Sequence, residues 1–382
     1  MTETIASARA LQPTLRKRAD EIEAARRLPA DLSGEFADAG FYRMCVPEMY
    51  GGLELPPMTT METIETVAAA DGSAAWCVFI AATSGTVLAL LPEEGAREVF
   101  PHEKTLLGGV FAPRGEAHPT DGGFRVNGRW AWGSGTQNAD WVMGGCRIFE
   151  GGEPAVDKNG APLSRMMLVP ASEVTFHDTW YVTGLSGTGS TDFEFADLFV
   201  PDRRAVGLGV DRPLERPLYA FPQFGLLAMG IAAVALGLAR AAIDELIDLA
   251  GAKTPAASSR PLAARQSAQM EVALAEAERR SARAFFYETI EAAWEMAERE
   301  GRIGVDERRD VRLATTHAVR ASASAVDRMY HLAGGTSVYR ASPLQRIFRD
   351  VHVATQHMMV APSTFELTGR LLLGLETQTG QL

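Results

Sequence analysis

The stretch FGLLAMGIAAVALGLA (residues 224–239) contains no charged side chain. A membrane span needs roughly 20 apolar residues. This stretch is shorter, is rich in glycine, and is followed closely by Arg240, Asp244 and Glu245. Outside a membrane, a helix that is apolar on all sides must be surrounded by other elements. The stretch therefore predicts the central helix of a bundle, and we expect no membrane partner.

Two long segments with helical periodicity follow, at residues 260–300 and 306–333. We expect a last helix that spans His352 and His357. Together with the central stretch, these segments predict a C-terminal four-helix bundle domain over residues 213–382.

Ahead of the bundle, from about residue 108 to 206, the periodicity changes to two and glycines become frequent. In FRVNGRWAW (124–132), Asn127 and Gly128 separate two alternating runs, which is the signal of a hairpin with a type I′ turn. The run DFEFADLFVP (192–201) also alternates. This pattern predicts an antiparallel β-barrel domain over residues 113–212.

The first third of the chain is again helical in its periodicity, with a break at Asp71 and Gly72. It predicts an N-terminal helical domain over residues 1–112. The expected fold class is therefore α+β and mostly α, with helices on both sides of one β domain in the chain.

The net charge of −11 argues against a nucleic-acid partner, which would require a basic surface. The N-terminal residues are acidic and basic without an apolar run, so we expect no targeting signal and a cytoplasmic location. Cys45, Cys77 and Cys146 are far apart and lack metal spacing, which predicts buried free thiols.

Five segments, in this order, resemble the acyl-CoA dehydrogenase superfamily, and the resemblance extends over nearly the whole chain. They are VPEMYGG (46–52), GRWAWGSGTQNADW (128–141), GLSGTGSTDFEFADLFVP (184–201), GLLAMGIAAVALGLARAAID (225–244) and LAGGTSVYRASPLQRIFRDVHVATQH (332–357). The resemblance implies a flavin between the β domain and the bundle, and a homotetramer.

By position, the resemblance implies that Ser134, Gly135 and Thr136 contact the reactive edge of the flavin. Hydrogen bonds near the flavin N5 and exclusion of water are what oxygen activation requires. A plain β-turn would also account for the GSG sequence.

The run Thr188, Gly189 and Ser190, with Trp180 ahead of it, resembles the second flavin-contacting loop of the family. Relatives often have an arginine just before this run, where the present sequence has Ser-Gly at 186–187. One positive contact to the flavin is therefore expected to be missing.

A third group resembles the phosphate-binding residues of the family. Lys253 follows the central helix, and Gly335, Thr336 and Ser337 form a turn with hydroxyl and amide donors. A lysine on a loop is more often simply solvated, so the turn is the firmer part of this prediction.

The residue at the family's usual catalytic position decides the reaction class. Acyl-CoA dehydrogenases mostly place a glutamate base nine residues after the arginine of an Arg-Asp pair. Counted from Arg349, that position is Met358, which cannot accept a proton. The neighbouring His357 instead matches the histidine of flavin-dependent hydroxylases that act on hydroxyphenylacetate and on steroid-derived phenols. A histidine can hold or deprotonate such a substrate.

Trp76 and Phe79 are expected to form an aromatic wall on the substrate side, although both residues would also suit a core position. Related hydroxylases often have a histidine some eight to ten residues after this tryptophan, where the present sequence has TSG at 83–85. We therefore expect a larger or less polar aromatic substrate. No metal is expected, because no cluster of ligands has metal spacing.

The resemblance as a whole implies an oxygenase component that uses reduced FMN or reduced FAD and molecular oxygen. It would hydroxylate a small aromatic substrate through a C4a-hydroperoxyflavin, with His357 activating the substrate and Ser134 stabilising the flavin adduct. Because the sequence has no GxGxxG after a strand, a separate NAD(P)H:flavin reductase is expected. The alternatives are N- or S-oxygenation, an acyl-CoA dehydrogenase or oxidase with an atypical base, and a bundle protein without flavin.

Overall fold

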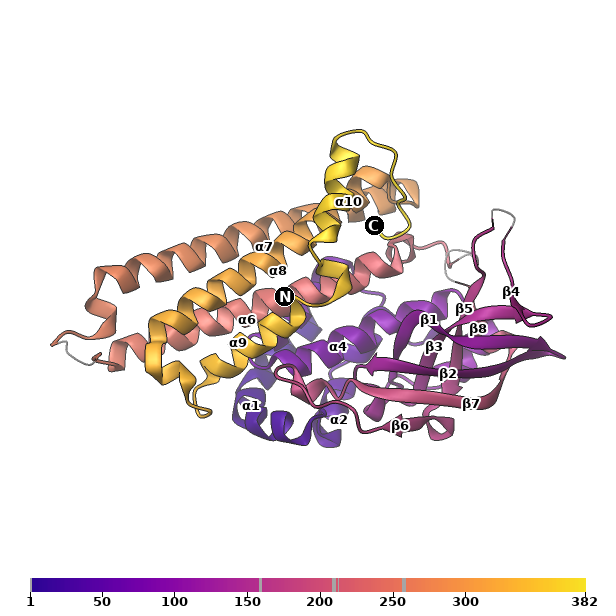
Figure 1. Cartoon of the computed structure of the whole chain (residues 1–382), viewed down its shortest axis with the longest axis horizontal. Coiled ribbons are helices and arrows are strands. Elements are labelled where there is room, and N and C mark those ends of the chain that lie inside the picture. The colour runs from indigo at the N-terminus through magenta and orange to yellow at the C-terminus, as the bar shows by residue number, and fades with distance from the viewer. Residues whose placement is uncertain (1, 158–159, 208–210, 212, 256–258) are drawn as a thin grey trace.

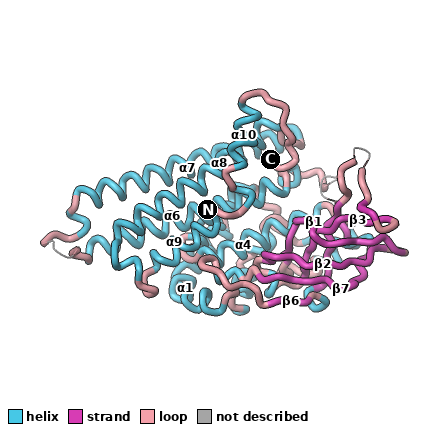
Figure 2. The backbone as a smooth tube through the Cα atoms, viewed as in Figure 1, coloured by secondary structure: helices cyan, strands magenta, loops and turns pink. Residues whose placement is uncertain are grey.

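A computed structural model describes residues 2–157, 160–207, 211, 213–255 and 259–382. Long helices form one part of the molecule and a twisted sheet forms the other, and the shorter N-terminal helices lie against both (Figures 1 and 2).

The N-terminal part is helical, as predicted, and its helix at residues 72–84 is buried at every position except Ile80. Its helices are α1 (Glu3–Ala25), α2 (Ala30–Asp38), α3 (Pro57–Ala68), α4 (Gly72–Ser84) and α5 (Glu93–Val99). Asp71 caps α4 by accepting a hydrogen bond from the backbone N–H of Ala74 at 2.8 Å. This cap ends the preceding helical segment and starts the helix that carries Trp76 and Phe79.

The C-terminal part consists of long helices packed side by side. They are α6 (Gln223–Ala252), α7 (Gln266–Glu300), α8 (Val305–Ala333), α9 (Pro343–Ala354) and the shorter α10 (Ser363–Leu372). Helix α6 packs against α8 and α9, and α7 packs against α8. With 30 residues, α6 is long enough to cross a membrane, and so is the segment 72–89, but 89% and 94% of their apolar windows are buried inside the fold. Burial, rather than length, identifies α6 as a core helix.

The prediction of one helix spanning His352 and His357 is wrong. Helix α9 ends at Ala354, and a 3-10 turn (Met358–Val360) follows after a bend. The hydroxyl of Thr355 donates to the carbonyl of His352 at 2.6 Å. This bond satisfies one of the backbone carbonyls that have no partner within the helix at its C-terminal end. The two histidines therefore face different surroundings.

The eight described strands form one open sheet, so the prediction of a closed antiparallel barrel is wrong. They are β1 (Leu107–Thr120), β2 (Gly123–Gly133), β3 (Trp141–Glu150), β4 (Glu153–Pro154), β5 (Ser164–Pro170), β6 (Thr175–His177), β7 (Thr191–Pro201) and β8 (Ala205–Val206). The order is β6-β7-β2-β1-β3-β5-β8, with β4 beside β3. After the β1–β2 hairpin, the chain crosses to the far side of β1, so β3 runs parallel to it. Alternation in a sequence does not specify which strands become neighbours.

The prediction of a hairpin turn at Asn127-Gly128 is also wrong, because both residues lie inside the continuous strand β2. Gly128 is there to make room for an indole: a Cβ on it would lie 2.6 Å from the Trp130 ring, and Cβ atoms on Gly115 and Gly144 would lie 2.3 and 2.7 Å from it. Trp130 is fully buried and donates to the Gly145 carbonyl at 2.8 Å. Three glycines thus form a slot for one tryptophan.

A buried ionic cluster joins the N-terminal helices to the long C-terminal helices. Glu65 of α3 is 6% exposed and accepts from Arg279, Arg283 and Tyr287, which are spaced four residues apart along α7. The donor–acceptor distances are 2.8–3.0 Å. Burial lowers the pKa of Arg279 and raises that of Tyr287. One carboxylate therefore compensates two cations and a phenol at the contact between two parts of the fold.

Candidate functional site

Three of the predicted site residues lie around a fourth, Trp76. Its indole N–H donates to the hydroxyl of Ser134 at 3.1 Å, and its ring lies edge-on to Phe79 with centroids 4.8 Å apart. The ring of His357 lies on Trp76 as well, at 6.0 Å between centroids. Helix α4, the turn after β2 and the turn after α9 thus converge on one indole.

A chain of hydroxyl groups continues from Ser134 into the second predicted loop. Ser134 Oγ lies 2.6 Å from Ser190 Oγ, and Ser190 Oγ lies 2.7 Å from Thr188 Oγ1. Thr188 Oγ1 donates to the carbonyl of Leu185 at 2.8 Å. Ser134, Ser190 and Thr188 are 7%, 3% and 1% exposed, so the chain lies out of contact with bulk water.

His357 is held in one protonation state. Its Nδ1 accepts the backbone N–H of Met359 at 3.2 Å, so the neutral ring carries its proton on Nε2. Burial and the Arg312 guanidinium lower the pKa of His357 to about 4. At neutral pH the ring therefore presents an N–H donor. Met358 points elsewhere, since its side chain is 62% exposed.

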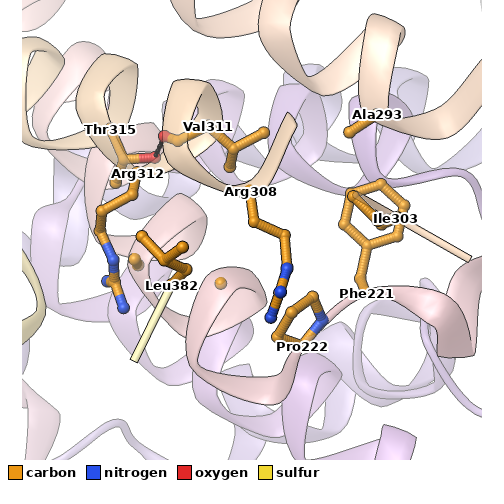
Figure 3. A pocket seen from close by; sticks show the side chains of 11 residues that line it. Phe221, Pro222, Ala293, Ile303, Arg308, Val311, Arg312, Thr315 and Leu382 are labelled. Carbon is orange, nitrogen blue, oxygen red and sulfur yellow. Dashed lines mark hydrogen bonds between the residues drawn. The ribbon is translucent and has the colours of Figure 1, made fainter. Parts of the chain in front are cut away.

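Arg312 holds the turn behind His357. Its guanidinium is 2% exposed and donates to the carbonyl of Met359 at 2.9 Å and to that of Gln381. In Figure 3, Arg312 and Arg308 project from α8 on either side of Leu382, against the start of α6. Arg312 thus fixes the residue whose N–H bonds His357.

The other predicted flavin-contacting residues shape the two loops. The backbone N–H of Gly135 donates to Thr188 at 2.9 Å, which ties the loops together. Thr136 is fully buried and its hydroxyl donates to the Gly133 carbonyl, so that hydroxyl is committed inside the turn. Gly135 and Gly189 both have positive φ (71° and 55°), which glycine adopts without strain. Trp180 braces the second loop by donating to Leu185 at 3.3 Å.

Two residues with a place in this site were missed from the sequence. Trp132, next to the GSG turn, has φ +67° and is 66% exposed, which is rare for an aromatic residue and marks strain beside the site. Asp350 of α9 accepts the backbone N–H of Leu185 at 2.6 Å. Its place directly after Arg349 is the sequence signal by which it could have been found.

The carboxyls of Asp350 and Asp71 are buried beside a cavity of about 310 Å³ between α1, α6, α9 and the turn before α4. Burial raises the pKa of Asp350 to about 7 and that of Asp71 to about 6. Between about pH 4 and pH 7 the folded protein keeps protons that the unfolded chain has released, so the free energy of unfolding falls as the pH rises through this window.

We therefore expect Asp350→Asn, which keeps an acceptor for Leu185 but cannot ionise, to gain stability relative to the wild type as the pH rises. The gain between pH 5 and pH 8 should be on the order of 1–3 kcal/mol. Denaturant unfolding of both proteins at the two pH values measures it. An equal difference at both values would contradict the assignment.

The predicted phosphate-binding residues lie elsewhere. Lys253 Nζ donates to Thr336 Oγ1 at 2.7 Å and to the Ala333 carbonyl at 2.5 Å, while the Ser337 hydroxyl donates to the Gly334 carbonyl. This group lies at the end of α6 remote from the sheet (Figure 1). Phe79 packs against Gly230, and Lys253 follows 23 residues later, so the two are about 35 Å apart along the helix. Gly335, with open space around it, belongs to the remote group.

The groups around Trp76 fit a flat, polar-edged ring rather than a metal. The indole ring of Trp76, the hydroxyl of Ser134 and the N–H of His357 supply an apolar face with a few directed polar contacts. Among the described residues, no three His, Cys, Asp or Glu side chains gather at a metal-binding distance. The three cysteines are free and buried, as predicted. The donor set therefore suits a flavin.

Comparison with known proteins gives consistent results. Family models for the acyl-CoA dehydrogenase N-terminal and C-terminal domains match residues 5–99 and 229–362. The chain is 37% identical to an indole-3-acetate monooxygenase of Pseudomonas putida, over 96% of this chain and 92% of that protein. It is 32% identical to the oxygenase subunit HsaA of a flavin-dependent monooxygenase of Rhodococcus jostii, over 91% and 92%. The solved structure of XiaF from Streptomyces with FADH2 and glycerol superposes with a TM-score of 0.89, at 26% identity over 98% and 96%.

Proposed function

The chain belongs to the flavin-dependent monooxygenases of the acyl-CoA dehydrogenase family, and from this premise we propose that it oxygenates a small aromatic compound, with an indole ring as the first candidate. The observation that carries the proposal is the position of Trp76 between the Ser134 hydroxyl and the His357 ring. Phenols and polycyclic aromatics fit the same wall of Trp76 and Phe79. The relative named as an indole-3-acetate monooxygenase supports testing indoles first.

Reduced FMN or reduced FAD, when bound, supplies the electrons and activates molecular oxygen. The chain's own groups do the rest. Ser134 offers a hydroxyl oxygen at the edge of the site, and the hydroxyl chain behind it holds that oxygen in place. Buried walls exclude bulk water, which strengthens each polar contact in the site.

His357 acts, in this proposal, as a hydrogen-bond donor rather than as a base. Its Nδ1 is already occupied by Met359, and its pKa of about 4 keeps the ring neutral at physiological pH. The Nε2–H can donate to a hydroxyl or carbonyl oxygen of the substrate, or to oxygen being transferred. Such a fixed donor in a dry site typically contributes 10²–10³ in rate.

The electrons come, we propose, from a separate NAD(P)H:flavin reductase that delivers reduced flavin by diffusion. A relative named as the oxygenase subunit of a flavin-dependent monooxygenase supports this arrangement. The purified chain should then not turn over with NADH and flavin until such a reductase is added.

We further propose that the helices α6 to α9 form a four-helix bundle that packs against other copies in a homotetramer. The cluster of Lys253, Gly335, Thr336 and Ser337 is too far from Ser134 to reach the same flavin, so it would serve the flavin of a neighbouring copy. Val338 and Tyr339, beside this cluster, are 68% and 73% exposed and would be covered there. A molar mass of four chains in solution is the expected result.

The decisive experiment supplies the enzyme with reduced flavin in oxygenated buffer and compares indole-3-acetate, indole and simple phenols. Hydroxylated product and hydrogen peroxide are quantified together. At least one aromatic compound should give product at the expense of peroxide. If every compound yields only peroxide, or if an acyl-CoA bleaches bound oxidised flavin, the proposed reaction is wrong.

A further inference from the structure

The hydroxyl chain behind the site has a single direction. Because a carbonyl only accepts, the proton of Thr188 points to Leu185. The contact between Thr188 and Ser190 must then be donated by Ser190, and the contact between Ser190 and Ser134 must be donated by Ser134. A hydroxyl has one proton and two acceptor positions. Ser134 has therefore already used its proton.

What Ser134 presents to the site is an acceptor. One of its two lone-pair positions takes the indole N–H of Trp76 at 3.1 Å, and the other is available to a ligand. Because each hydroxyl has one proton, Ser134 can become a donor only if Ser190 and Thr188 turn as well and Thr188 gives up its bond to the Leu185 carbonyl. The hydroxyl chain therefore discriminates between a ligand that donates a hydrogen bond to Ser134 and a ligand that can only accept one.

The two redox states of a flavin differ in this property. Reduced flavin carries a hydrogen on N5, whereas oxidised flavin has only a lone pair there. We infer that the chain of Ser134, Ser190 and Thr188 is a specificity-determining device that favours reduced over oxidised flavin by keeping Ser134 an acceptor. This inference rests on the proposed function, which places the flavin edge at Ser134.

Helix α9 fixes the end of the hydroxyl chain that lies farthest from Ser134. Leu185, which receives the Thr188 proton, has φ +52° and is not a glycine, so its conformation needs support. Asp350 accepts the Leu185 N–H at 2.6 Å. A Cβ on Gly184 would lie 2.5 Å from the backbone of Arg349, so the loop sits directly on α9, and Arg349 donates to the Thr183 carbonyl at 2.5 Å. These contacts keep the Leu185 carbonyl aimed at Thr188.

The test compares the affinities of reduced and oxidised flavin, measured by anaerobic and aerobic fluorescence titration. Ser190→Ala leaves the Ser134 proton without a partner, so Ser134 can turn and donate to oxidised flavin. The preference for reduced flavin should fall about five- to tenfold, the size of one neutral hydrogen bond. Thr188→Val should act in the same direction, because Ser190 then donates to Ser134 and releases its proton.

Ser186→Ala is the matched control, since Ser186 lies in the same loop but its hydroxyl donates to Val182, outside the chain. It should leave the preference unchanged. An unchanged preference in both Ser190→Ala and Thr188→Val would overturn the inference. Failure of the proposed function would look different: the wild-type enzyme would form peroxide without product.

Discussion

Replacing Glu65 with alanine should lower the free energy of unfolding by about 3–5 kcal/mol, because it leaves buried charges without a counter-ion. Arg279 and Arg283 would face each other with no carboxylate between them, and Tyr287 would lose its acceptor. Since the cluster joins α3 to α7, the contact between these two helices should weaken most.

Equilibrium denaturation of the two proteins measures this effect, and hydrogen exchange of α3 locates it. Glu93→Ala is the matched control: Glu93 pairs with Arg97 one helical turn away, with both side chains about 60% exposed. Such a surface pair contributes about 0.2–1 kcal/mol or less. A similar loss of unfolding free energy in the two variants would mean that the buried Glu65 cluster stabilises the fold no more than a surface ion pair does.

The largest expected effect on activity is that of His357→Ala, which should lower the rate of product formation about 100-fold. Removing the Nε2–H removes a fixed donor from the site while the hydroxyl chain at Ser134 stays intact. Oxygen consumption should continue, and most of it should appear as hydrogen peroxide. Product and peroxide, measured against oxygen consumed, give the result directly.

His357→Gln, which restores an N–H donor on a flexible side chain, should recover part of the lost product formed per oxygen consumed. His352→Gln is the control, because that ring bonds Asp327 on α8 at 2.8 Å and does not face Trp76. The pH profile tests the protonation state of His357. A ring that keeps its ordinary pKa of 6.5 would give a limb near that pH, whereas a pKa of about 4 predicts no limb between pH 5.5 and 8.

The helices were predictable because their signals are local. The apolar run inside α6 and the break at Asp71 each follow from a few neighbouring residues and survive in the structure. The sheet was less predictable. Asn127-Gly128 is a turn signal only if nothing distant needs the glycine, and here the ring of Trp130 needs it. Strand order, too, depends on pairings between segments far apart in the chain.

The candidate site, too, could be predicted from the sequence only in part. Residue types and positions indicated Trp76, Ser134 and His357, and the structure brings these three together. The link between Ser134 and Ser190 spans 56 residues of sequence, and that between Leu185 and Asp350 spans 165. No periodicity reports such contacts. The expectation that His357 lies on a helix was wrong for a related reason: whether α9 continues past Ala354 depends on what the next turn binds.

The tryptophan slot in the sheet also restricts how this protein can diverge. Trp130 cannot be exchanged for a small residue without opening a void beside Phe193, which stacks on it, and Phe195, which contacts it at a tilt. None of the glycines at 115, 128 and 144 can acquire a side chain while that ring is present. A viable descendant must therefore alter several of these positions together or none of them. The four residues, which lie within 30 positions of sequence, should therefore be retained together or replaced together among related proteins.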